Sequence, residues 1–158
     1  MRISTKFPVA VHALIMIAAL SEKQKINSDK ISDSTGVNAV IIRNIFALLK
    51  QAGIILVSPG PGGTTLARSP DEITLWDILT AVEPVQTEDI FKFHQNPSEH
   101  CPFGSSIYGL LKTHLDDTVD SMKEELTNVT LSMLLNELYE LMPFLRGSPN
   151  QGEKESIT

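Results

Sequence analysis

The sequence predicts a mainly α-helical fold in which one short β-hairpin interrupts the helices. Apolar residues recur at helical spacing over most of the 158 residues. A β-prone run at residues 54–57 is followed by a loop, residues 58–63, that holds three glycines and two prolines. Directly before it, two predicted helices are separated only by a turn at Gly36. This order predicts a winged helix-turn-helix with a small hairpin wing, followed by long carboxyl-terminal helices.

The first helix is expected over residues 6–20, with one buried face. That face would consist of Val9, Ala13, Ile17 and Leu20. The apolar run is too short to span a bilayer, and no plausible signal-peptide cleavage site follows it. We therefore expect a cytoplasmic protein without a membrane partner, which fits a chain with a single cysteine.

The second and third helices form the predicted helix-turn-helix. Ser28 is expected to cap a helix that ends near residue 35. Asn38 should cap the next, which runs to about residue 52 and is stopped by Gly53. Its inward residues would be Ile42, Ile45, Phe46 and Leu49, and its outward residues Asn38, Val40, Ile41, Arg43, Asn44 and Ala47.

The outward face of the third helix suggests a function. Arg43 can donate to guanine or to phosphate, and Asn44 can pair with adenine. Val40 and Ile41 can contact thymine methyl groups in a major groove. The alternative is that these two residues pack under the hairpin or against the first helix.

The hairpin is expected to pair residues 54–57 with residues 64–67. Its loop has little side-chain bulk, so its amides can approach a phosphate closely. No Gly-Lys-Ser/Thr follows the loop, so it is not a nucleotide-binding Walker loop. A helix over residues 74–83, capped by Thr74, should follow.

Two amphipathic helices, residues 105–126 and 130–142, are expected in the carboxyl-terminal half. The apolar stripe of the first consists of Ile107, Leu111, Leu115, Val119, Met122 and Leu126. A two-fold partner would bury such stripes, which predicts a homodimer; packing within one chain is the alternative. The predicted organisation is a DNA-binding domain (1–83), a linker (84–104), dimerisation helices (105–145) and a disordered tail (146–158).

Charge is distributed unevenly along the chain. Residues 1–68 hold eight basic and three acidic residues, whereas the remainder holds five basic and sixteen acidic residues, within a total of −6. A basic amino-terminal part is expected where the chain meets phosphate. No nucleophile–base pair, HExxH motif or recognisable carboxylate pair is present, so we do not expect an enzyme.

Several short segments, in this order, resemble the Rrf-two family of bacterial transcription regulators, whose members include IscR, NsrR and CymR. They are MRISTKF at residues 1–7, TGV at 35–37, LKQAG at 49–53, PGPGG at 59–63 and EITLWDI at 72–78. The segment NPSEHCPFG at residues 96–104 is most similar to the YwnA-like branch.

The resemblance implies a homodimeric DNA-binding regulator that acts on a partly palindromic operator in double-stranded DNA. We interpret it as a repressor, and activation is the alternative. The matching DNA-contact positions are Ser4, Thr5, Lys6, Ser28, Asn38, Val40, Ile41, Arg43, Asn44, Ser58, Gly60, Gly62 and Gly63. Many relatives have an arginine where Ser58 or Pro59 stands here. Its loss predicts weaker preference for a narrow A·T minor groove, with a hairpin that touches only phosphates.

Cofactor chemistry is not expected. Cluster-bearing relatives use three cysteines in the segment that holds only Cys101 here, and iron–sulfur clusters need several thiolates. A mixed metal site of Cys101 with His94, Glu99 and His100 is a weaker alternative. Cys101 is interpreted as a structural residue that folds the linker onto the core, or as a redox-responsive thiol. The alternative function is a winged-helix sensor or protein-interaction module with weak or no DNA binding.

Overall fold

The computed structural model describes residues 3–60, 62–83, 90–93, 96–98 and 100–146. The helices are α1 (Lys6–Leu20), α2 (Ser28–Thr35), α3 (Ala39–Gln51), α4 (Leu75–Val82), α5 (Pro102–Asn128) and α6 (Leu131–Leu141). Two strands, β1 (Ile55–Ser58) and β2 (Gly63–Leu66), form the hairpin, and the described residues also form the short 3-10 helices η1 (Pro70–Glu72) and η3 (Pro143–Arg146). The predicted fold class, mainly α with a small hairpin wing, is confirmed.

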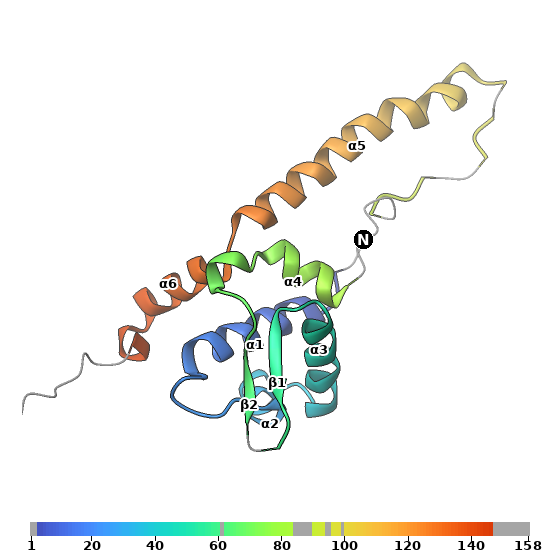
Figure 1. Cartoon of the computed structure of the whole chain (residues 1–158). Coiled ribbons are helices and arrows are strands. Elements are labelled where there is room, and N and C mark those ends of the chain that lie inside the picture. The colour runs from blue at the N-terminus through green and yellow to red at the C-terminus, as the bar shows by residue number, and fades with distance from the viewer. Residues whose placement is uncertain (1–2, 61, 84–89, 94–95, 99, 147–158) are drawn as a thin grey trace, which may run out of the picture.

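Figure 1 shows a compact body made of α1 to α4 and the hairpin, from which α5 projects as an arm. The carboxyl-terminal part of α5 packs against α4. The 27 residues of α5 give it a length of about 40 Å. Along the described chain, no helix combines the length and apolar character needed to cross a membrane.

The core of the body forms around α1, which is apolar on nearly all sides. Its fully buried residues are Ala10, Ala13, Leu14 and Ile17, whereas Val9 and Leu20, expected in that face, are only half-buried. The predicted inward face of α3 is confirmed, since Ile42, Ile45, Phe46 and Leu49 are all buried.

Helix α6 belongs to this core, which corrects the expectation that a two-fold partner buries the apolar stripes of both carboxyl-terminal helices. Leu131 and Leu135 are buried in the same apolar cluster as α1, and Tyr139 packs against it. The alternative of packing within one chain therefore holds for α6. Residues 131–141 stabilise the body, although the expected domain division placed them with the dimerisation helices.

Element boundaries differ from the expected ones in small ways. The strands lie one position away, with Ile55 paired to Leu66 and Ser58 paired to Gly63. Helix α5 begins at Pro102, so residues 102–104 belong to it and not to the linker. Arg146 ends η3, and the remainder of the predicted tail, 147–158, lies outside the described residues.

Candidate nucleic-acid interface

The helix-turn-helix is fixed by its caps. The side chain of Asn27 accepts a hydrogen bond from the Lys30 amide at 2.9 Å, so Asn27 caps α2 and the prediction of Ser28 was wrong by one residue. Gly36 then turns the chain with a φ of +70°, and the Asn38 side chain caps α3 by accepting from the Val40 amide at 2.8 Å. Displacement from the cap frees the Ser28 hydroxyl for another contact.

The outer face of α3 lies open to solvent. Val40 is 55% exposed and Ile41 46% exposed, so neither is packed under the hairpin or against α1 in a single chain. Arg43 and Asn44, one turn further along, are exposed as well. Two exposed β-branched residues next to an arginine and an asparagine match the methyl-contacting and hydrogen-bonding chemistry of a major-groove reader.

Arg43 is oriented by the amino-terminal end of α2. Its Nε donates to the Ser28 hydroxyl at 3.3 Å, and a terminal nitrogen lies 3.9 Å from the Asp29 carboxylate. Both partners are solvent-accessible, so this ion pair holds the side chain in place rather than adding much stability. The guanidinium keeps further donors for a base edge or a phosphate.

The hairpin is attached to the segment before α2. The Thr64 amide donates to the Ile26 carbonyl at 2.8 Å, and the Lys25 ammonium donates to the Gly60 carbonyl at 3.1 Å. A Cβ on Gly63 would lie 2.8 Å from the Lys25 side chain, so only glycine allows this close approach. Four consecutive residues, 25–28, thus connect the hairpin loop to Arg43 on α3.

Sequence reasoning missed Lys25. It lies in a polar turn between helices and matches no motif; only its place in the basic amino-terminal half distinguished it. Of the predicted hairpin positions, Ser58, Gly60 and Gly62 are exposed at the loop, whereas Gly63 is buried against Ile26 and has a packing role.

Ser4, the first of the predicted contact residues before α1, is bonded to the residue that follows α4. The Ser4 amide donates to the Glu83 carboxylate at 2.8 Å, and the Ser4 hydroxyl accepts from the Lys6 amide at 3.2 Å. Thr5 is the residue before α1 and its side chain makes no capping bond. Thr5 and Lys6 are exposed, so the expected contact of Ser4, Thr5 and Lys6 with a DNA backbone stays a prediction.

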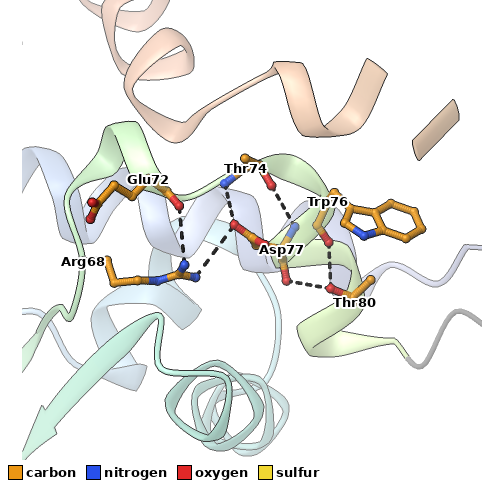
Figure 2. Close-up of polar contacts among 6 residues, drawn as sticks. All are labelled: Arg68, Glu72, Thr74, Trp76, Asp77 and Thr80. Carbon is orange, nitrogen blue, oxygen red and sulfur yellow. Dashed lines mark hydrogen bonds and ion pairs between the residues drawn. The ribbon is translucent and has the colours of Figure 1, made fainter. Parts of the chain in front are cut away.

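A polar network joins the hairpin to α4 (Figure 2). Arg68, just after β2, donates to the Glu72 carbonyl at 3.5 Å and lies 3.8 Å from the Asp77 carboxylate. Asp77 and Thr74 form a reciprocal capping box at the start of α4, as the cap prediction for Thr74 required. Thr74 lies in turn beside Thr130, with the Leu75 amide donating to the Val129 carbonyl at 2.9 Å. The hairpin, α4 and the α5–α6 junction are therefore held together.

The predicted dimerisation stripe on α5 is covered unequally. Val119 is buried and Leu115, Met122 and Leu126 are half-buried, while Ile107 and Leu111 remain exposed. Phe103 is 84% exposed and Leu110 63% exposed in the same part of the helix. Residues 102–111 contain no charged side chain. A single chain therefore leaves the first ten residues of α5, 102–111, as an exposed surface that is mostly apolar and carries no charge.

Cys101 is the residue before α5, at the end of the arm that lies away from the body (Figure 1). This placement contradicts the interpretation that Cys101 folds the linker onto the core. The backbone N–H groups of Gly104 and Phe103 hydrogen-bond to its sulfur and lower the pKa of the Cys101 thiol.

The donors around Cys101 do not fit an iron–sulfur cluster. The sequence contains no second thiol, and the described residues hold no group of three or more His, Cys, Asp or Glu side chains arranged to bind a metal. His94 and Glu99, which the mixed-site alternative requires, lie outside the described residues.

Comparison with known proteins decides the family. The model of the Rrf2 family, described as iron-dependent transcriptional regulators, matches residues 3–137. The chain belongs to the Rrf2 family. The predicted family is thereby confirmed, and like its relatives this Rrf2 protein is a DNA-binding transcription regulator and not an enzyme.

Individual relatives agree with this assignment. The chain is 32% identical over 137 residues to YwnA of Bacillus subtilis strain 168, a candidate HTH-type transcriptional regulator, covering 87% of this chain and 99% of YwnA. It is 28% identical to the transcriptional regulator IscR of Pectobacterium carotovorum, covering 86% of this chain and 80% of IscR. The structure of the global cysteine regulator CymR of B. subtilis has the same fold, with a TM-score of 0.66 at 22% identity over 87% of this chain and 98% of CymR.

Proposed function

We propose that this Rrf2 protein is a homodimeric, cytoplasmic repressor that binds a partly palindromic operator. Each protomer would insert α3 into the major groove, and its hairpin loop would follow the neighbouring phosphate backbone. The observation that supports this most directly is the exposed face of α3, where Val40 and Ile41 stand beside Arg43. The apolar side chains of this face can contact thymine methyl groups, and its hydrogen-bonding side chains can pair with base edges, whereas water offers the apolar side chains no favourable contact.

The exposed apolar residues at the start of α5 support the proposed dimer. Phe103, Ile107, Leu110 and Leu111 are exposed without any interspersed charge. A second copy of the same helix would cover them, because a two-fold contact matches a surface with itself. The two α3 helices would then be related by the same axis, which explains why the operator should read as an inverted repeat.

We propose repression because it needs no activity besides DNA binding: a protein that occupies an operator across a promoter excludes the polymerase. We propose further that the chain acts without an iron–sulfur cluster, since Cys101 is its single thiol. The family description as iron-dependent regulators would then not extend to cluster binding by this member.

Selection of bound fragments from random-sequence duplex DNA tests the proposal. We expect an enriched inverted repeat whose half-sites are separated by one helical turn or a multiple of it. Affinity for that duplex should fall steeply as salt rises, because bound phosphates release counterions. A template carrying the selected repeat across a promoter should be transcribed less in vitro when the protein is added. Failure to enrich any sequence would contradict the proposal and favour a protein-interaction module.

A further inference from the structure

The hairpin of this protein has no charge of its own. Residues 54–67, which include both strands and the loop between them, contain no Lys, Arg, Asp or Glu. Two elements can place such a hairpin on a DNA backbone: its amides and any cation supplied from elsewhere in the chain. Among the residues that the structure describes, Lys25 is a cation that hydrogen-bonds directly to the loop.

We propose that Lys25 is the phosphate-binding residue of the hairpin, supplied from the segment between α1 and α2. Its ammonium donates to the Gly60 carbonyl at 3.1 Å, at the tip of the loop. An ammonium has three donors, so a hydrogen bond to Gly60 leaves two for a phosphate oxygen. The side chain is exposed, and a bound phosphate need not displace any buried contact.

The position of Lys25 is fixed by the backbone on both sides. The Thr64 amide bonds to the Ile26 carbonyl at 2.8 Å, and Gly63, at a φ of +84°, leaves the Lys25 stem room that a Cβ would take. The ammonium is therefore held at the loop before DNA arrives, which reduces the entropy that binding must overcome.

Lys25 also lies in one connected surface with the face of α3. Ser28, three residues later, accepts the hydrogen bond from Arg43, and Lys30 of α2 bonds to Gln24 beside Lys25. Asp29 is the acidic residue of this segment that lies beside Arg43, with 3.9 Å between its carboxylate and the guanidinium. Lys25, Lys30 and Arg43, which we call the cationic strip, thus belong to the segments that connect the hairpin loop to α3, where a phosphate backbone would pass from one groove to the next.

This inference rests on the proposed DNA-binding function, and its test separates the two. Lys25→Met retains the stem against Gly63 and removes only the ammonium. Lys23→Met is the matched control, because Lys23 belongs to the same turn but donates to the Leu145 carbonyl at 3.1 Å, on the side of η3. Both variants lose one charge, so a general change in net charge affects them equally.

The measurement is the dependence of affinity on salt, for the duplex selected by the wild type and for a scrambled duplex. We expect Lys25→Met to reduce the slope of log K against log salt by about one for each bound protomer, on both duplexes, while Lys23→Met and Lys25→Arg keep the wild-type slope. Replacing single phosphates by neutral methylphosphonates should weaken the wild type at the loop-facing positions and leave Lys25→Met unaffected there.

A Lys25→Met slope equal to the wild type, or equal slopes in Lys25→Met and Lys23→Met, would overturn the assignment of Lys25 while leaving operator binding intact. If the wild-type chain itself selects no duplex, the proposed function fails, and the assignment fails with it. Thermal unfolding of both variants should match the wild type, since neither ammonium is buried.

Discussion

Two of the surfaces that expose large apolar side chains, on α3 and on α5, differ in their electrostatic surroundings. On α3, Val40 and Ile41 lie beside Arg43, which belongs to the cationic strip with Lys25 and Lys30. On α5, residues 102–111 have no charged neighbour within their own segment. Exposed apolar side chains surrounded by cations are suited to DNA, which carries phosphate charges and presents thymine methyl groups in its major groove. An uncharged apolar stripe is suited to contact with another protein surface.

The largest effect is expected on α5. In the proposed two-fold contact, Leu111→Asp would bury one carboxylate from each protomer. Each uncompensated buried charge should make the free energy of dimerisation less favourable by about 3 kcal/mol or more. We expect sedimentation to show a monomer that is folded as the wild type is. Thr113→Asp, two residues along on the same helix, serves as the control and should remain dimeric. A dimeric Leu111→Asp would remove this stripe from the interface.

Arg43→Ala breaks the other surface. Loss of a bidentate base contact costs about 1–3 kcal/mol in each half-site, so specific affinity should fall by on the order of a hundredfold or more in the dimer. Fluorescence anisotropy on the selected duplex measures this, and sedimentation should still show a dimer. If operator affinity were unchanged, Arg43 would lie outside the recognition surface.

The substitution Leu131→Ala tests whether α6 is part of the core around α1 or, like the start of α5, lies outside it. Leu131 is fully buried in the core around α1, so its truncation should lower the free energy of unfolding by about 2–5 kcal/mol. Leu141→Ala on the same helix, where Leu141 is 80% exposed, should change it by less than about 0.5 kcal/mol. Chemical denaturation compares the two, and equal losses would contradict the core assignment.

The adjacent residues Asn27 and Ser28 have different roles: Asn27 caps α2, and Ser28 orients Arg43. Asn27→Ala removes the α2 cap and should cost about 1 kcal/mol of stability. Ser28→Ala should leave stability nearly unchanged but weaken operator binding, because Arg43 loses the hydroxyl that orients it. Denaturation and anisotropy, measured on both variants, would show the reverse pattern if Ser28 were the cap.

The smallest effect concerns Cys101. Because its amide contacts lower the pKa of the thiol, the thiolate forms at lower pH in the folded chain than in the unfolded chain. The rate of alkylation by iodoacetamide should therefore reach half its maximum at lower pH in the native protein than in denaturant. Coincident pH profiles would show that these amides do not stabilise the thiolate. Cys101→Ser should be folded and colourless; a visible absorption band lost in that variant would instead indicate a cofactor.

The sequence predicted the fold and the family because each depends on local patterns. Helical spacing identified the inward face of α3, and the Asn38 and Thr74 caps follow from side-chain chemistry within a few residues. The cap of α2 was misplaced because Asn27 and Ser28 are both good caps, and only backbone geometry distinguishes them.

Features that depend on contacts between distant segments were not predictable. Leu131 and Leu135 have the same periodicity as a dimerisation stripe, and only their packing on α1 shows that the chain covers them itself. Lys25 meets Gly60 across 35 positions, and nothing in its neighbourhood indicates that contact. Cys101 was expected near the core because a linker was expected to fold back, whereas it directly precedes α5, at the end of that helix that lies away from the body.

The most direct test of the account is the mass of the protein–DNA complex, measured by sedimentation on a duplex recovered by selection. Two protomers bound to each duplex, on an inverted repeat, are the predicted result. One protomer on each duplex, or a mixture in which selected and scrambled duplexes bind equally well, would contradict it.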